Sequence, residues 1–130
     1  MINTHAFDYI NVLDKAADAS WLRNQAIDNN IANVDTPGYK RQDVAFESEL
    51  KKALGRSSDT SNMDQRVAAI KTAQLKPKAY TDLVGYSYRL DGNNVDIDTE
   101  NVMLAENQIK YQGLINSISE EFANLKMVMK

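Results

Sequence analysis

The first quarter of the chain carries one continuous helical pattern. Between residues 6 and 34, a seam of mostly apolar or small residues recurs at alternating intervals of three and four positions. This is the spacing of a helix that packs along its length against another helix. No Gly or Pro interrupts the pattern, so we expect one helix of about 43 Å. The seam has two polar members and consists of Ile10, Leu13, Ala17, Ser20, Asn24, Ile27, Ile31 and Val34.

Residues 100–129 repeat this pattern near the other end of the chain. The second seam consists of Leu104, Gln108, Tyr111, Ile115, Ile118, Phe122, Leu125 and Met129. Two helices of similar length predict an antiparallel hairpin. Aligning their ends places Asn24 near Gln112 and Ser20 near Asn116. Polar pairs inside such a seam cost stability but fix its register.

The first helix also carries a stripe of small residues beside its seam. This stripe consists of Val12, Ala16, Ala19 and Ala26. Small side chains let a second helix approach closely, so the stripe fits a packing face for a neighbouring subunit. Alanine also has the highest intrinsic helix propensity, and the stripe fits that simpler interpretation equally well.

A sharp turn is predicted where the first helix ends. Thr36 precedes a proline and is therefore pushed toward extended geometry. Pro37 suits the first corner of a type II turn, and Gly38 suits the second corner, which requires a positive φ. Asn33 is a plausible end of the helix because Asn tolerates the left-handed region.

The middle of the chain has weaker patterns. Residues 40–46 alternate loosely and favour an extended segment, and residues 47–54 favour a short helix that Gly55 ends. Residues 55–66 are polar and predict a mobile loop, whereas residues 67–80 predict no clear element. Residues 86–90 alternate like a strand.

The second long helix is preceded by a turn signal and a capping signal. Asp91-Gly92 predicts a tight turn, and Asp98 or Thr99 is suited to cap the helix. The predicted fold is therefore mainly α, a coiled-coil-like antiparallel hairpin. Residues 1–34 and 99–130 form this hairpin, and residues 35–98 supply a turn, short extended segments and a flexible loop.

Composition and charge exclude several classes of protein. The formal net charge is −3, whereas a nucleic-acid-binding protein usually has a basic face. There is no cysteine, so disulfides and thiolate chemistry are excluded. No run of 18 apolar residues predicts a membrane span. Residues 1–5 lack the basic and apolar segments of a cleavable secretory signal.

The sequence also offers little for catalysis or ligand binding. The acidic stretch 91–100 does not place its oxygen ligands and glycine as a calcium-binding loop requires. His5 is the single histidine, near the terminus, and no phosphate loop or nucleophile motif is present. We therefore predict neither an enzyme nor a cofactor, metal or small-molecule site.

Two segments resemble one known family. Residues 30–41, Asn-Ile-Ala-Asn-Val-Asp-Thr-Pro-Gly-Tyr-Lys-Arg, resemble the signature at the end of the first helix of bacterial flagellar rod and hook proteins. Residues 90–100, with the following Ala105-Glu-Asn-Gln-Ile-Lys-Tyr-Gln112, resemble the C-terminal region of proximal rod members of that family. The second match is the more specific.

This resemblance implies a structural subunit of the basal-body rod. Such proteins are exported through the flagellar type III apparatus and assemble with copies of themselves, with other rod proteins and with an adaptor to the ring and export gate. A head-to-tail contact that does not close gives a filament. The residues expected to mediate assembly are Ile10, Leu13, Trp21, Ile27, Ile31, Thr36, Pro37, Gly38, Tyr39, Tyr111, Ile115, Ile118, Phe122 and Leu125.

Two alternatives remain at this point. The chain fits a non-polymerising helical-hairpin adaptor or export chaperone, or another rod protein of the same family. Because two helices alone form a small core, we expect much of the stability of the assembled subunit to come from its neighbours.

Overall fold

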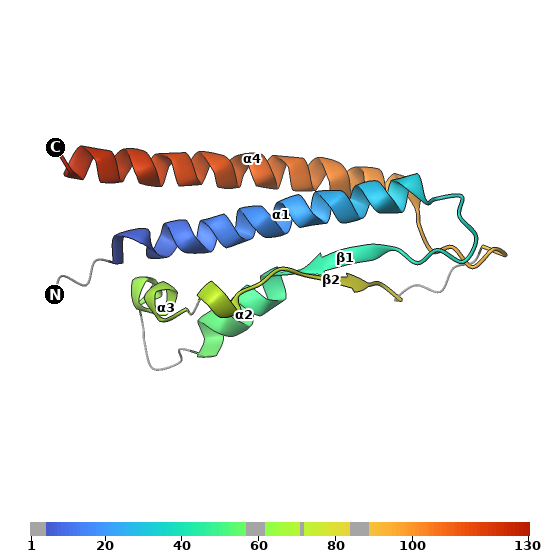
Figure 1. Cartoon of the computed structure of the whole chain (residues 1–130), viewed down its shortest axis with the longest axis horizontal. Helices are drawn as coiled ribbons and strands as arrows, with labels where there is room; N and C mark the ends of the chain where they lie inside the picture. The colour runs from blue at the N-terminus through green and yellow to red at the C-terminus, as the bar shows by residue number, and fades with distance from the viewer. Residues whose placement is uncertain (1–4, 57–61, 71, 84–88) are drawn as a thin grey trace.

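Two long antiparallel helices define the structure, a computed structural model that describes residues 5–56, 62–70, 72–83 and 89–130. Helix α1 (Asp8–Ala32) follows a short 3-10 turn, η1 (His5–Phe7), and α4 (Ile97–Val128) packs along it. The start of α1 and the end of α4 lie at the same end of this hairpin (Figure 1). The prediction of a mainly α hairpin is thus confirmed.

A smaller layer covers the side of α1 that α4 leaves open (Figure 1). It consists of β1 (Gln42–Ala45), α2 (Glu47–Arg56), α3 (Met63–Ala69), η2 (Thr72–Gln74) and β2 (Lys78–Thr81). The two strands pair antiparallel, with Gln42 opposite Thr81 and Ala45 opposite Lys78. Strand β1 buries Val44, whereas all four residues of β2 are exposed. We call residues 40–83 the middle layer.

The main apolar core lies between α1 and the middle layer. Ala19 packs with the buried Phe46 and Leu75, and Ala16 and Leu50 border this cluster. The small-residue stripe is therefore a packing face, as one of its two interpretations predicts. The element that packs on it is not the neighbouring subunit that this interpretation expects. At Ala16 and Ala19 the stripe receives the chain's own middle layer rather than a neighbouring subunit.

Seven of the eight predicted seam residues lie on α1, and all seven are buried or half-buried. The eighth, Val34, is half-buried but lies beyond the helix, which ends at Ala32. The seam on α4 is only half correct. Leu104, Tyr111, Ile118 and Leu125 are half-buried, but the alternate members Gln108, Ile115, Phe122 and Met129 are exposed. Asn107 is buried where Gln108 was expected, and Leu114 is half-buried where Ile115 was expected.

Asn107 shows that the predicted register of the hairpin is wrong. Its amide donates to the Ser20 carbonyl and to Asn24 Oδ1, each at 2.7 Å, and its own oxygen accepts from Ser20 Oγ at 2.9 Å. Ser20 and Asn24 therefore share Asn107 instead of meeting Asn116 and Gln112. Polar groups do meet inside the seam, as expected, and every hydrogen bond formed there favours this register.

The turn after α1 matches its prediction. Gly38 has φ +73°, and the Tyr39 amide donates to the Thr36 carbonyl at 3.2 Å, as a type II turn requires. Helix α1 ends at Asn33 as expected, but for a different reason. Asn33 has φ −106°, outside the left-handed region, and its side-chain amide donates to the Asn29 carbonyl at 2.8 Å.

Several expectations for the middle of the chain are corrected. The short helix after residue 46 is present, but it continues through Gly55 to Arg56. Residues 63–66, expected in a loop, begin α3, and residues 67–80 contain the end of α3, η2 and part of β2. The most polar part of the expected loop, residues 57–61, lies outside the described residues, as does most of the strand expected at 86–90.

Helix α4 begins two or three residues earlier than predicted. Asp96 is the N-cap, and its carboxylate accepts from the backbone amides of Asp98 and Thr99. The Asp91-Gly92 turn is confirmed by Gly92, which has φ +77°. Over the described ranges, none of the helices has a stretch both long and apolar enough to cross a membrane.

Candidate assembly interface and the clasp at the hairpin tip

The two segments that carry the family resemblance bind each other at the hairpin tip. Asn93 is fully buried, and its side-chain amide donates to the carbonyls of Asn33, Val34 and Thr36 at 2.8, 3.0 and 2.9 Å. These carbonyls follow the end of α1, where helical hydrogen bonding stops. The Asn93 oxygen accepts from the Val95 amide at 2.8 Å. The Asn93 side chain thus provides hydrogen bonds to three backbone carbonyls of the turn and to one backbone amide.

Backbone contacts complete this arrangement. The Gly38 amide donates to the Asp91 carbonyl at 2.7 Å, and the Lys40 ammonium donates to the Gly92 carbonyl. A Cβ on Gly92 would lie 3.7 Å from Gly38 Cα, so the two turns pass close together. We call residues 33–41 and 89–95, with these bonds, the tip clasp. It joins segments about sixty residues apart in the sequence.

A buried charge network lies directly behind the tip clasp. Glu100, on α4, is 1% exposed and accepts from Arg41 Nε at 2.7 Å and from the Asn30 amide at 3.2 Å. Arg41 also pairs with Asp82, which follows β2. Burial alone would lower the pKa of Arg41, but the hydrogen bonds to Glu100 and Asp82 outweigh it, so its pKa is raised.

Asn30 connects this network to α1. Its oxygen accepts from the Gln42 amide at 2.8 Å and from the Tyr39 hydroxyl at 3.1 Å, and its amide also donates to the Gln42 carbonyl at 2.8 Å. The side chain is completely buried and fully hydrogen-bonded. Asn30 therefore fixes the start of β1 against the last turn of α1, and α4 meets both through Glu100.

A second charged cluster holds three helices together halfway along the hairpin. Glu47, at the start of α2, accepts two bonds from Arg23 of α1, at 2.7 and 2.6 Å, and one from Lys110 of α4. Hydrogen bonding from Arg23, the largest cause, holds the pKa of Glu47 well below its usual value, and the bond from Lys110 acts in the same direction. We call these three residues the Glu47 bridge.

The Glu47 bridge predicts a modest loss of stability in acid. Because the pKa of Glu47 is lower in the folded chain than its unfolded value of 4.5, the bridge contributes fully above that pH. Its contribution falls as the pH drops below 4.5 toward the folded pKa. Glu47 is 49% exposed, which limits the effect to about 1 kcal/mol.

The Glu47→Gln variant should therefore lose less stability than the parent chain between about pH 5 and pH 3. Urea unfolding midpoints at the two pH values measure this difference. Glu49→Gln is the matched control, because Glu49 lies on the same helix, is about equally exposed and pairs only with the exposed Lys52. Equal acid sensitivity in Glu47→Gln and the parent would contradict the role of the bridge.

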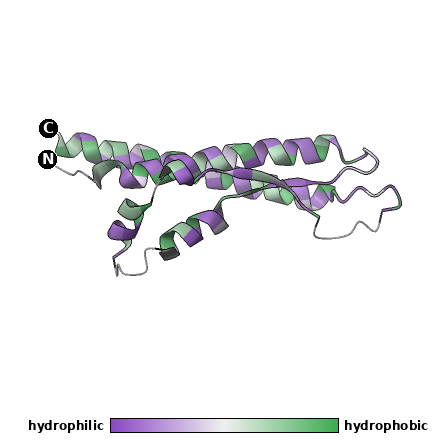
Figure 2. Ribbon diagram, turned by 60° about the horizontal axis from the view of Figure 1, so that its bottom comes forward, coloured by the Kyte–Doolittle hydropathy of each residue, from purple (hydrophilic) through white to green (hydrophobic). Residues whose placement is uncertain are grey.

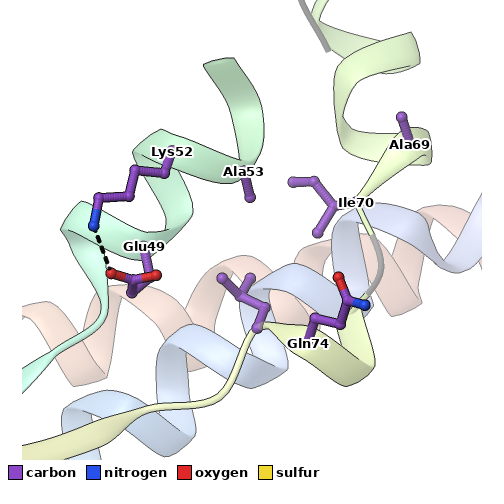
Figure 3. Close-up of a pocket in the computed structure, with 7 residues that line it drawn as sticks. Glu49, Lys52, Ala53, Ala69, Ile70 and Gln74 are labelled. Carbon is purple, nitrogen blue, oxygen red and sulfur yellow. Dashed lines mark hydrogen bonds and ion pairs between the residues drawn. The ribbon is translucent and has the colours of Figure 1, made fainter. Parts of the chain in front are cut away.

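Figure 3 shows a small hollow in the middle layer. Its volume is about 210 Å³, and it lies between α2 and the segment from α3 to η2. Ala53, Ala69 and Ile70 give it an apolar wall, and the Glu49–Lys52 ion pair lies on α2 at its edge. This is a gap beside the core cluster, and the two charged residues of its lining, Glu49 and Lys52, pair with each other.

The residues predicted to mediate assembly fall into two groups. One group is exposed and available to a neighbour: Trp21, Thr36, Pro37, Gly38, Ile115 and Phe122. The other group is already buried or half-buried within the chain: Ile10, Leu13, Ile27, Ile31, Tyr39, Tyr111, Ile118 and Leu125. Sequence reasoning merged the two groups because it treated one seam as both the hairpin contact and the assembly contact.

Several large apolar side chains are exposed along α4. Helix α1 is covered by α4 and by the middle layer, but α4 is covered by α1 along one side only (Figure 1). Figure 2 shows hydrophobic segments recurring along α4 to its C-terminal end. Val102, Ile109 and Met127 are 58%, 75% and 67% exposed. Apolar surface of this kind marks interaction sites on soluble proteins.

Comparison with known proteins agrees with this geometry. A family model described as "Flagella basal body rod protein" matches residues 24–40, which end in the tip clasp. The flagellar basal body rod protein FlgB of Bacillus subtilis is 33% identical over 126 residues, covering 90% of this chain and 89% of the relative. FlgB of Borreliella burgdorferi is 36% identical over 121 residues, covering 87% and 89%.

The chain belongs to the FlgB family of flagellar basal body rod proteins. FlgB of Escherichia coli is also similar, at 33% identity over 115 residues and 83% of both chains. The relatives are structural rod proteins, and the chain is a structural subunit of this kind. Within the family, the tip clasp and its network are what the two signature segments build in this chain.

Four side chains that organise the site were missed by the sequence analysis: Asn93, Asn107, Glu100 and Arg41. A signal for two of them exists in retrospect. Glu100, Leu104, Asn107 and Tyr111 are spaced 4, 3 and 4, as a seam requires. They were passed over because charged and amide side chains are usually exposed. No comparable signal singles out Asn93 or Arg41.

Proposed function

We propose that the chain polymerises through its terminal helices into the proximal part of the flagellar rod and helps to transmit torque. In this proposal residues 1–34 and 99–130 form the rod core, and residues 35–98 support it. The partners are other copies, other rod proteins and the adaptor between rod, ring and export gate. Delivery uses the flagellar type III export apparatus.

One observation carries this proposal. Helix α4 is 32 residues long and packs along its length on one side, against α1, with α2 reaching it through the Glu47–Lys110 pair; it leaves Val102, Ile109 and Met127 exposed. Assembly explains this exposed apolar surface, because neighbouring subunits would cover it and remove it from water. The exposed members of the predicted set, Trp21, Ile115, Phe122 and the turn Thr36-Pro37-Gly38, are further candidates for contact with neighbours.

Ile109→Glu tests the proposal. Since Ile109 is 75% exposed, the variant should fold with a stability within about 0.5 kcal/mol of the parent. It should nevertheless fail to enter purified basal bodies and fail to restore motility to cells that lack the chain, because a charge would then lie in an apolar contact.

Asn101→Glu is the matched control, since it adds the same charge at an exposed polar position of α4. This control should enter basal bodies normally. If Ile109→Glu assembles as well as the control, α4 is not the assembly surface. A parent chain that binds rod components but never enters the basal body would instead favour the non-polymerising adaptor.

A further inference from the structure

One flank of the hairpin is turned away from the middle layer and carries exposed aromatic and aliphatic side chains. The side facing α2 is fixed by Arg23 and Lys110, which both bind Glu47. Trp21 is two residues from Arg23, and Ile115 is five residues from Lys110. These separations place Trp21 and Ile115 about 160° and 140° around their helices from the α2 side. Trp21 is 55% exposed.

The register extends this flank toward the chain ends. Ser20 lies opposite Asn107, and Asn30 lies opposite Glu100. Continuing the same register brings Phe7 to the level of Phe122. Phe7 and Phe122 are 53% and 51% exposed, and each lies at a multiple of seven positions from Trp21 or Ile115. We call the surface that contains Phe7, Trp21, Ile115 and Phe122 the far flank.

Acidic side chains border the far flank on α1. Asp14 and Asp28 lie seven residues on either side of Trp21, and Asp18 lies one turn before it. All three are exposed, and among the described residues none of them forms an ion pair. The far flank therefore combines a hydrophobic stripe with uncompensated negative charge.

The middle of the chain has the opposite charge. Residues 40–78 carry nine Lys and Arg against five Asp and Glu, whereas residues 1–39 carry two against five and residues 79–130 four against eight. Lys51 on α2 and Lys76 and Lys78 beside or in β2 are exposed and make no ion pair within the described ranges. The exposed Tyr80 lies on the same strand as Lys78.

We infer that the far flank of one copy binds the outer surface of the middle layer of the next copy. This inference rests on the proposed function and names the surfaces that meet. Trp21 supplies the apolar anchor typical of protein interfaces. The aspartates and lysines select the partner and its orientation, because exposed ion pairs contribute little affinity individually. Two different surfaces on each copy make the contact heterologous, so it can repeat from copy to copy.

Reciprocal charge reversal tests this contact. One variant carries Asp14→Lys, Asp18→Lys and Asp28→Lys, and the other carries Lys51→Glu, Lys76→Glu and Lys78→Glu. Each variant alone should self-associate about tenfold or more weakly than the parent at low salt, by sedimentation or light scattering. An equal mixture should recover association, because each variant then offers the surface that the other requires.

Crosslinking in assembled rods gives a second measurement that does not depend on altered charges. The chain has no cysteine, so Asp18→Cys and Lys78→Cys can be placed in separate copies and oxidised in purified basal bodies. Disulfide-linked pairs are expected. Circular dichroism of every variant checks that the helices are intact, and the crosslink remains decisive if a triple variant fails to fold.

The outcomes separate this inference from the proposed function. Charge-reversed variants that associate like the parent would overturn the inference, as would a parent that never self-associates. A parent that enters basal bodies without forming the crosslink would overturn this pairing of surfaces and leave the rod function standing. A parent that never enters basal bodies would overturn the proposed function itself.

Discussion

Replacing Arg41 with methionine is expected to destabilise the folded chain by about 3–5 kcal/mol. The substitution removes the guanidinium that binds Glu100 Oε1 at 2.7 Å and also pairs with Asp82. Glu100 is 1% exposed, so its carboxylate would then be buried with only the Asn30 amide as a side-chain donor. Removing one partner of a buried pair is costly because the other charge stays desolvated.

Chemical denaturation at neutral pH measures this loss, and a second substitution identifies its cause. In Arg41→Met combined with Glu100→Gln the buried group is neutral, so part of the loss should be recovered. Lys51→Met is a control for removing an exposed cation and should change the stability by less than about 0.5 kcal/mol. A loss below about 1 kcal/mol in Arg41→Met would mean that water replaces the guanidinium.

Asn93→Ala is expected to cost roughly 3 kcal/mol, because it removes several hydrogen bonds from a buried site. Three carbonyls, of Asn33, Val34 and Thr36, would lose the amide that they share. The Val95 amide would lose its acceptor. The tip clasp should then open, and the end of α1 should become accessible to solvent.

Hydrogen exchange at residues 33–41 and 91–95, together with an unfolding curve, tests this expectation. Asn101→Ala is the control, since Asn101 is an exposed asparagine on α4. Asn93→Asp is informative as well. It keeps an oxygen acceptor for Val95 but places a carboxylate against the three carbonyls, so it should be at least as destabilising as alanine. Normal protection of the turn in Asn93→Ala would contradict the role of the clasp.

The long helices and the turn between them were predictable because local chemistry specifies them. The α1 seam repeats without a break, and its seven members within the helix are buried or half-buried because α1 is the central element and is covered on two sides. The turn succeeded because Pro37 and Gly38 each fit one corner of a type II turn. The predicted start of α4 was two or three residues too late, because Asp96, Asp98 and Thr99 are each suited to cap a helix.

The alignment of α1 with α4 could not be predicted from hydrophobic periodicity. A hairpin seam accepts several alignments that differ by a turn, and aligning the helix ends selects the wrong one. The register is set instead near the hairpin tip, where Glu100 binds Asn30 and Arg41. These are polar contacts between residues distant in sequence, and a hydrophobic pattern carries no information about them. Sequence reasoning therefore found the two helices but not how they face each other.

The middle layer was underestimated for a related reason. Strands of four residues and a helix of seven have little stability of their own. They form here because Phe46 and Leu75 pack onto Ala19 of α1. The same contact decides between the two interpretations of the small-residue stripe: Ala16 and Ala19 form a packing face, but for the chain's own middle layer and not for a neighbouring subunit.

The placement of the tip clasp also has a consequence for the order in which the chain can fold. Asn93 and Glu100 act on residues that precede them by about sixty to seventy positions, so no early local fragment can form these bonds. A chain that has delivered only α1 and the middle layer can pair β1 with β2 and pack Leu75 onto Ala19, but it cannot yet close the larger loop that the tip clasp requires. The native pairing of α1 with α4 can therefore form only after the last third of the polypeptide is present.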